Sequence, residues 1–337
     1  MAEKVIDNRH IFGMSRAAGY ACVDDFVDAV NHAPELSIHL PATAEEWEEA
    51  NRGFRQKSLH EVMFGAALAI DGFFCRTNMP RQSEVTNVIA YYSGHYESYG
   101  VNCQAAVFAN LEFAFFGIMG PGSANDLTMY ALASELRNAI DNLPGGMYAL
   151  GDAAYPLGER LLVPFTGDER EDPYHDSFNF FLSQLRIRVE MAFGRLVTKF
   201  RILGNRVEGS LERVSSVLMA CARLHNFIIR MEGPPRAEGV AAVVTSEEED
   251  EETELSREVS PVARAPLGMG YLPVVPNPND VGDLADGVSH QRDAIVHLIR
   301  TMGYDRPDHN LARQRARQNV FVFPDGDVVH RNYLAPR

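Results

Sequence analysis

Two short apolar runs that each end at an aspartate constrain the fold of this chain most. Val62–Ile70 is followed by Asp71, and Gly145–Gly151 is followed by Asp152. Short apolar runs of this kind are typical of buried strands. A third acid, Glu190, lies in a stretch whose apolar residues recur at helical spacing. A strand end can hold a carboxylate at the rim of a sheet, and a helix that crosses the rim can add another. We therefore expect an α/β domain that gathers these acids.

The order of the remaining elements also predicts an α/β domain. After the first strand, the patterns predict a hairpin, a helix, a short strand and two long helices, at Cys103–Ala109 with Leu111–Ile118, Asp126–Leu143, Met147–Leu150, Phe178–Leu203 and Leu211–Met231. We place this domain at residues 59–232.

Helices are predicted ahead of this domain, in residues 1–58. Residues 10–32 look helical in two pieces, with an N-cap at Ser15 and with Val23, Phe26, Val27 and Val30 on one face. The segment is either part of a helix-turn-helix or a plain packing helix. Residues 41–58 predict a capped surface helix with Trp47 as a packing anchor.

The composition changes after Gly233. Proline-rich and acidic sequence over residues 233–288 predicts a disordered linker. In the last region, residues 289–337, a helix is predicted at Ser289–Met302 and a hairpin within Asn319–Val329, with Asp325-Gly326 as its turn. The C-terminal extension is thus expected to be only partly ordered.

The bulk properties exclude some classes of protein. The four cysteines are scattered, which disfavours zinc sites and disulfides. No apolar run reaches the roughly 18 residues of a membrane span, and Met1–Val5 shows no signal-peptide pattern, so we expect an intracellular soluble protein with no membrane partner. The net charge of −15 opposes DNA binding, but the segment 246–254 alone carries seven acids.

Each acid also has a purely structural interpretation. Asp71 could cap a turn, Asp152 could cap a helix, and Asp126 could be explained by the dipole of the helix that it opens. Glu190 could pair with Arg186, four residues before it. If the acids instead converge, their charge must be neutralised by protons or cations.

Two hard cations, Mg²⁺ or Mn²⁺, would suit such a set of carboxylates and would activate water against a phosphodiester. We expect Asp71 and Asp152 to hold one ion, Asp71 and Glu190 to hold the second, and Asp126 to be a further ligand. Five cations are expected to face DNA and contact its phosphates, although a solvated helix face would look the same: Arg186, Arg188, Arg195, Lys199 and Arg201.

Seven short motifs occur in an order that is similar to one known family. They are Ala69–Gly72, Tyr91–Gly94, Gly120–Ser123 with Asp126, Gly151–Pro156, Phe178–Asn179, Arg186–Leu196 and Arg223–Ile228. Together they resemble the DDE transposases of the PIF/Harbinger superfamily and the nucleases derived from them. Phe12–Val30 is similar to the helix-turn-helix that precedes the catalytic domain in that family.

The resemblance implies an RNase H-like core with two divalent cations, in which Asp71, Asp152 and Glu190 are the three catalytic acids and Asp126 is a further one. It implies cleavage of DNA with subsequent strand transfer, a Myb-like DNA-binding partner and residence in the nucleus; a homo-oligomer is left open. The chain departs from the family at Phe73-Phe74, where a polar pair is common, and at His95, where a basic residue is frequent.

Two other classes of function remain. One is a domesticated, non-catalytic DNA-binding or scaffold protein that keeps the transposase fold. The other is an unrelated hydrolase that uses His225 with a nearby acid, although a histidine in such a helix is more often a structural hydrogen-bonding residue.

Overall fold

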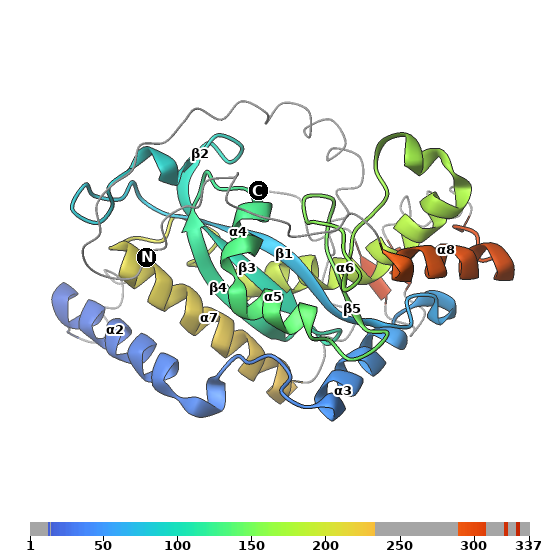
Figure 1. Ribbon diagram of the computed structural model, residues 1–337. Coiled ribbons are helices and arrows are strands. Elements are labelled where there is room, and N and C mark those ends of the chain that lie inside the picture. The colour runs from blue at the N-terminus through green and yellow to red at the C-terminus, as the bar shows by residue number, and fades with distance from the viewer. Residues whose placement is uncertain (1–12, 14, 233–288, 308–319, 323–327, 331–337) are drawn as a thin grey trace.

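A computed structural model describes residues 13, 15–232, 289–307, 320–322 and 328–330. Its centre is a mixed β-sheet flanked by helices (Figure 1). The strands of this sheet are β1 (Ala66–Arg76), β2 (Tyr92–Ser93), β3 (Ser98–Val107), β4 (Phe113–Pro121), β5 (Tyr148–Leu150) and β6 (Leu161–Leu162).

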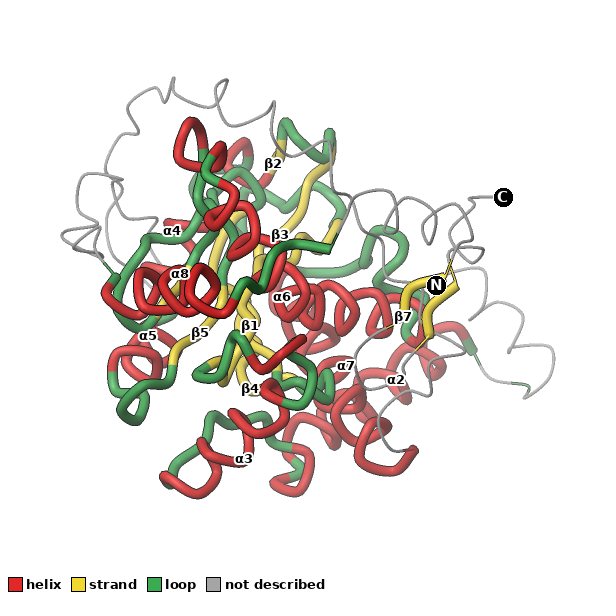
Figure 2. The backbone as a smooth tube through the Cα atoms, turned by 90° about the vertical axis from the view of Figure 1, so that its right-hand side faces the viewer, coloured by secondary structure: helices red, strands yellow, loops and turns green. Residues whose placement is uncertain are grey.

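The strand order is β4–β3–β1–β5–β6, and the short β2 pairs with the first residues of β3. Strands β1, β3 and β4 are antiparallel, whereas β5 and β6 run parallel to β1. The backbone tube in Figure 2 shows β1 in the middle of the molecule, between β3 and β5. This mixed sheet with flanking helices confirms the predicted α/β class and agrees with an RNase H-like core.

Helices cover both faces of the sheet. Their bounds are α2 (Arg16–His32), α3 (Ala44–Arg55), α4 (Asp126–Leu132), α5 (Ser134–Asp141), α6 (Pro173–Lys199), α7 (Leu211–Glu232) and α8 (His290–Met302). Helices α6 and α7 pack on one face, and α2 lies along α7; the other face carries α3, α4 and α5 (Figure 1). Short 3₁₀ turns occur at Pro34–Leu36, Leu59–Glu61, Ile89–Tyr91 and Gly167–Glu171.

The first strand differs from its prediction. It begins at Ala66 and continues through Asp71 to Arg76 instead of ending at Ile70. Asp71 and Gly72 look like a turn in the sequence, but Asp71 pairs with Ala105 of β3 and Gly72 pairs with Gln104. The ladder with β3 therefore outweighs the local turn signal, and Asp71 lies in the middle of a strand, not at its end.

The other predicted elements of the core are confirmed with small changes. The hairpin, the short strand and the two long helices form as β3–β4, β5, α6 and α7. The predicted helix over 126–143 is divided into α4 and α5, because Ala133 has a non-helical ψ of 61°.

The N-terminal region forms a packing layer. Ser15 caps α2 by accepting a hydrogen bond from the amide of Ala18, as predicted. The two predicted pieces form one continuous helix from Arg16 to His32, and residues 10–12 and 14 lie outside the described residues. Val27 and Val30 are buried, but Phe26 is 57% exposed, which contradicts its expected place on the buried face. Helix α3 forms as predicted, with a capping box at Thr43 and with Trp47 buried.

The C-terminal helix packs on α6. Helix α8 begins after Ser289, as predicted, and the carboxylate of Glu159 accepts hydrogen bonds from the amides of His290 (2.7 Å) and Gln291 (3.3 Å). The expected hairpin forms from β7 (Val320–Val322) and β8 (Val328–His330). Its turn and the predicted linker 233–288 lie outside the described residues.

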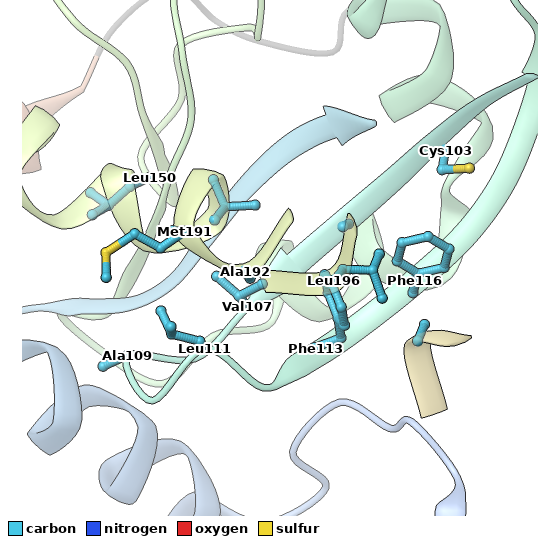
Figure 3. Close-up of a cluster of buried hydrophobic side chains, with 14 of the residues drawn as sticks. Cys103, Val107, Ala109, Leu111, Phe113, Phe116, Leu150, Met191, Ala192 and Leu196 are labelled. Carbon is cyan, nitrogen blue, oxygen red and sulfur yellow. The ribbon is translucent and has the colours of Figure 1, made fainter. Parts of the chain in front are cut away.

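One large apolar cluster fills the space between α6 and the sheet. Figure 3 shows Met191, Ala192 and Leu196 of α6 beside residues of the β3–β4 hairpin, among them Val107 and Phe113. This cluster fixes the height and the rotation of α6 above β1, which the site described below requires.

Helix α7 is fixed to the hairpin by two buried polar side chains. The imidazole Nε2 of His225 lies 2.8 Å from the carbonyl oxygen of Leu111. The amide group of Asn226 accepts from the backbone N–H of Phe113 and donates to its carbonyl, both at 2.8 Å.

We predict that Asn226→Ala lowers the free energy of unfolding by about 2–4 kcal/mol, because it leaves a buried backbone donor and acceptor of Phe113 unpaired. Urea unfolding measures the change. Asn205→Ala, in an exposed turn, is the control and should stay within about 0.5 kcal/mol of wild type. Similar losses in the two variants would contradict this account of Asn226.

Candidate functional site

The first two members of the candidate site are Asp71 of β1 and Glu190 of α6, joined by Arg186. One guanidinium nitrogen of Arg186 lies 2.9 Å from Glu190 Oε1, and another lies 3.4 Å from Asp71 Oδ2. Arg186 and Glu190 are four residues apart and so share one face of α6. The exposed fraction of the side chain is 14% for Arg186, 19% for Asp71 and 29% for Glu190, so the group is largely buried.

The parallel pairing of β1 and β5 brings Asp152 toward Asp71. Ala69 pairs with Leu150, and each aspartate lies two residues further along its strand direction. Because side chains two residues apart leave a strand on the same side, both carboxylates are directed toward α6. Asp152 Oδ1 accepts a hydrogen bond from the amide of Ala154 in a turn; no helix begins there, so its interpretation as a helix cap is wrong.

Asp126 approaches from the other face of β1. It is the first residue of α4, while the cap is Asn125, whose side chain accepts from the amide of Thr128. A Cβ on Gly72 would lie 2.4 Å from Asp126 Oδ1. The absence of a side chain at Gly72 therefore lets this carboxylate rest against the strand, next to the backbone of Asp71.

Two uncharged side chains support the acids. Gln104 Nε2 donates to the carbonyl oxygen of Asp71 (3.1 Å) and to the hydroxyl of Tyr155 (2.9 Å). Both side chains are buried. Neither residue was predicted from the sequence, although Gln104 is the one polar residue in an otherwise apolar strand run, and such a buried amide must find partners.

The pKa values show that the three aspartates share one electrostatic environment. Burial raises the pKa of Asp71 well above its usual range; Arg186 opposes this, and Asp152 and Asp126 add to it. Burial and Asp152 raise the pKa of Asp126 to about 6. Burial also raises the pKa of Asp152, against the opposing effect of Arg186. Burial, followed by the charges of Asp71, Asp126 and Asp152, raises the pKa of Tyr155, so its hydroxyl lies near all three aspartates.

The donor set fits a hard divalent cation, since carboxylate oxygens are the ligands that Mg²⁺ and Mn²⁺ prefer. Within the described part of the chain, however, no three acidic, histidine or cysteine side chains are close enough together to hold an ion as they stand. Arg186 provides the positive charge between Asp71 and Glu190. Any ion that joined these two acids would therefore have to displace the guanidinium.

The five cations expected to face DNA do not form one surface. Arg188 is 3% exposed, so its predicted contact with a phosphate is wrong. It lies two residues after Arg186, and residues two apart on a helix point in nearly opposite directions. The side chain of Arg188 therefore enters the core. Arg195 and Lys199 form ion pairs with Glu232 at 3.0 and 3.3 Å. Arg201 lies in the exposed turn after α6.

His225 has a structural environment. It is 2% exposed and contacts the carbonyl oxygen of Leu111, and burial lowers its pKa to about 4. These contacts favour its structural interpretation over that of a catalytic base.

The arrangement defines a class: a mixed α/β fold in which largely buried carboxylates from a central strand, a neighbouring strand end and a crossing helix lie around one arginine. A family model described as "DDE superfamily endonuclease" matches residues 70–226. The matched segment is slightly less than half of the chain and contains all four acids. It is therefore similar to endonucleases of this family, which supports an enzyme of the nuclease type.

The other comparisons give no relatives. No curated protein and no solved structure matches the chain. Among the residues that the structure describes, none of the helices is both long enough and apolar enough to span a bilayer.

The raised pKa of Asp126 predicts a pH-dependent loss of stability in the metal-free protein. The folded state binds this proton more tightly than the unfolded state between pH 3.8 and about 6, so stability is fully present below this window and is lost as the pH rises through it. Asp126→Asn should therefore stabilise the protein at pH 7 by up to about 3 kcal/mol, since each tenfold change in proton affinity corresponds to about 1.4 kcal/mol.

Urea unfolding in EDTA at pH 4 to 7 measures this effect. Asp141→Asn, at the exposed end of α5, is the matched control and should follow wild type. A wild-type stability that rises across the same window, or an Asp126→Asn curve parallel to it, would contradict the assignment.

Proposed function

We propose that this protein is a divalent-metal-dependent DNA endonuclease or transposase that cleaves phosphodiester bonds with Asp71, Asp152 and Glu190. One observation carries the proposal: acids from β1, from the end of β5 and from α6 meet in a largely buried group whose charges interact. So many buried carboxylates around one arginine are costly in a protein that needs them only for its structure. The similarity of residues 70–226 to DDE endonucleases supports the same reaction.

Two Mg²⁺ or Mn²⁺ ions, when bound, would lower the pKa of a water molecule and neutralise charge on the phosphate and the leaving oxygen. The residues of the chain would have distinct roles. Asp71 and Asp152 would hold one ion, Asp71 and Glu190 the other, and Asp126 would be a further ligand or would hold the others in place. Gln104 and Tyr155 would orient Asp71 through its backbone carbonyl.

The transposase group, the protein partner and the cellular location are part of the same proposal. The seven motifs favour the PIF/Harbinger group, in which a freed 3′-hydroxyl would replace water for strand transfer. A separate Myb-like protein would supply sequence-specific DNA binding, which a chain with a net charge of −15 needs. The protein would then act in the nucleus, as a monomer or a homo-oligomer.

We predict that Asp152→Asn folds like wild type but loses Mn²⁺-dependent nicking of supercoiled plasmid by at least about a hundredfold, since even residues that only support metal ligands cost 10–100-fold when they are replaced. Agarose gels of plasmid relaxation measure the rate. Asp168→Asn, in an exposed turn, is the control and should nick like wild type. Equal nicking by Asp152→Asn and wild type would remove Asp152 from the mechanism.

A second candidate is a domesticated, non-catalytic DNA-binding or scaffold protein. The ion pairs of Arg186 favour it, because one guanidinium contacts both Asp71 and Glu190 and can neutralise their charge. Such a protein would keep the fold and use the arginine as a permanent counter-ion.

Calorimetry with Mn²⁺ separates the two candidates. The endonuclease proposal predicts that wild type binds Mn²⁺, that Asp152→Asn binds it more weakly, and that Arg186→Gln binds at least as tightly as wild type, because the competing guanidinium is gone. If wild type shows no binding while Arg186→Gln does, the non-catalytic candidate is correct. If neither variant nor wild type binds, the acids are not a metal site.

A further inference from the structure

Two arginines lie side by side at the end of β1 that is remote from the core of the sheet. Thr77 and Val207 form an isolated parallel bridge, and the amide of Val207 donates to the carbonyl oxygen of Arg76 at 2.9 Å. The residue before each bridge partner is an arginine, Arg76 or Arg206. Both bridge partners are buried, whereas both arginines are exposed. In a parallel register, this alternation directs the two arginine side chains to the same side.

These two arginines, like the exposed Arg81 and Arg201, form no ion pair with a described acid. Arg52, Arg55 and Arg230 form ion pairs with Glu49, Glu61 and Glu112, each at 2.7 Å. No described carboxylate forms an ion pair with Arg76 or Arg206, although Glu208 lies only two residues beyond the second one. Two like charges held together by the backbone repel each other unless an anion lies between them.

An aromatic cluster adjoins this pair. Phe74, two residues before Arg76 on the same face of β1, stacks on Tyr96 with ring centroids 4.3 Å apart, and His95 packs edge-on against Tyr96 at 4.5 Å. Tyr96 is 44% exposed. Two of the positions at which the chain departs from its family, Phe74 and His95, thus lie in this cluster. Guanidinium groups beside exposed aromatic rings suit nucleic acid, whose phosphates alternate with flat bases.

We propose that Arg76 and Arg206 form a phosphate clamp for the DNA backbone, separate from the acids and independent of metal. Arginine is suited to this role because its planar fork binds two phosphate oxygens at once. The clamp rests on the proposed function only in that DNA is the ligand; it does not require that the acids be catalytic.

The position of Arg76 along β1 places the proposed clamp relative to the acids. Arg76 is five residues beyond Asp71 along β1, or about 16 Å at 3.3 Å per residue, and because this separation is odd the two side chains leave opposite faces of the strand. The clamp would therefore hold DNA at the far end of β1 and on the face opposite to the Asp71 carboxylate.

The experiment measures binding of a fluorescent 30-base-pair duplex in EDTA, where no cleavage can occur, at 50 to 200 mM salt. Each phosphate contact adds about 0.9 to the slope of log affinity against log salt concentration. Replacing both arginines, Arg76→Ala with Arg206→Ala, should lower the slope by about 1.8 and make binding at 50 mM salt weaker. The difference should shrink about tenfold by 200 mM salt, because the two lost contacts are themselves sensitive to salt.

The matched control is Arg52→Ala with Arg55→Ala on α3, which changes the net charge equally and should keep the wild-type slope. Arg76→Lys with Arg206→Lys should keep most of the slope, and thermal unfolding checks that every variant folds. The clamp is ruled out if the alanine pair leaves the slope unchanged, if the α3 control loses as much, or if wild type binds no DNA at 50 mM salt.

Inorganic phosphate, added at constant ionic strength, distinguishes DNA from a free anion. If millimolar phosphate abolishes the difference between wild type and the alanine pair, the site binds free phosphate and its assignment to DNA is wrong. Failure of the plasmid-nicking prediction would leave this result intact, because the duplex assay contains no metal.

Discussion

The candidate site depends on the hydrogen-bonded ladders on both sides of β1. On one side β3 pairs with Asp71 through Ala105, and on the other β5 pairs with Ala69 through Leu150. A strand held along both edges cannot move its backbone without breaking either ladder, so the first carboxylate is fixed. Gln104 adds a hydrogen bond from β3 to the carbonyl oxygen of that same residue. The other acids are carried to this fixed point by separate elements.

Charge balance follows from this geometry. Asp71, Asp126 and Asp152 influence one another, and burial raises the pKa of each. Without a metal ion, the cost of burying these groups is reduced in two ways, by protonation and by the guanidinium of Arg186. A divalent cation would replace both. Arg186 is therefore better described as the resident counter-ion of the acids than as a contact for DNA.

Much of this core could be predicted from sequence because its signals are local. The apolar runs predicted the strands, the helical spacing predicted α6 and α7, and the acids after β5 and within α6 stand out by their positions in these patterns. The predictions that were wrong concern residues whose environment is set by tertiary structure. A turn-like Asp71-Gly72 continues a strand because β3 binds it, and Arg188 is buried because the rotation of α6 is set by packing. The roles of Gln104 and Tyr155 arise only when β3 and the loop after β5 lie side by side.

The distribution of the cations then decides where DNA can be held. Arg186 serves the acids, Arg188 is buried, and Arg195 and Lys199 are paired with Glu232, so the helix that carries Glu190 has little positive charge to offer a phosphate. The exposed arginines that form no ion pair with a described acid are Arg76, Arg81, Arg201 and Arg206. They lie at the far end of β1, in the segment after it and in the connection after α6. Because β1 carries both Asp71 and Arg76, the strand fixes the distance between the proposed clamp and the acids, although the two side chains leave opposite faces. A chain of strongly negative net charge would in this way hold DNA through a few arginines fixed in place, because the local field decides where an anion binds.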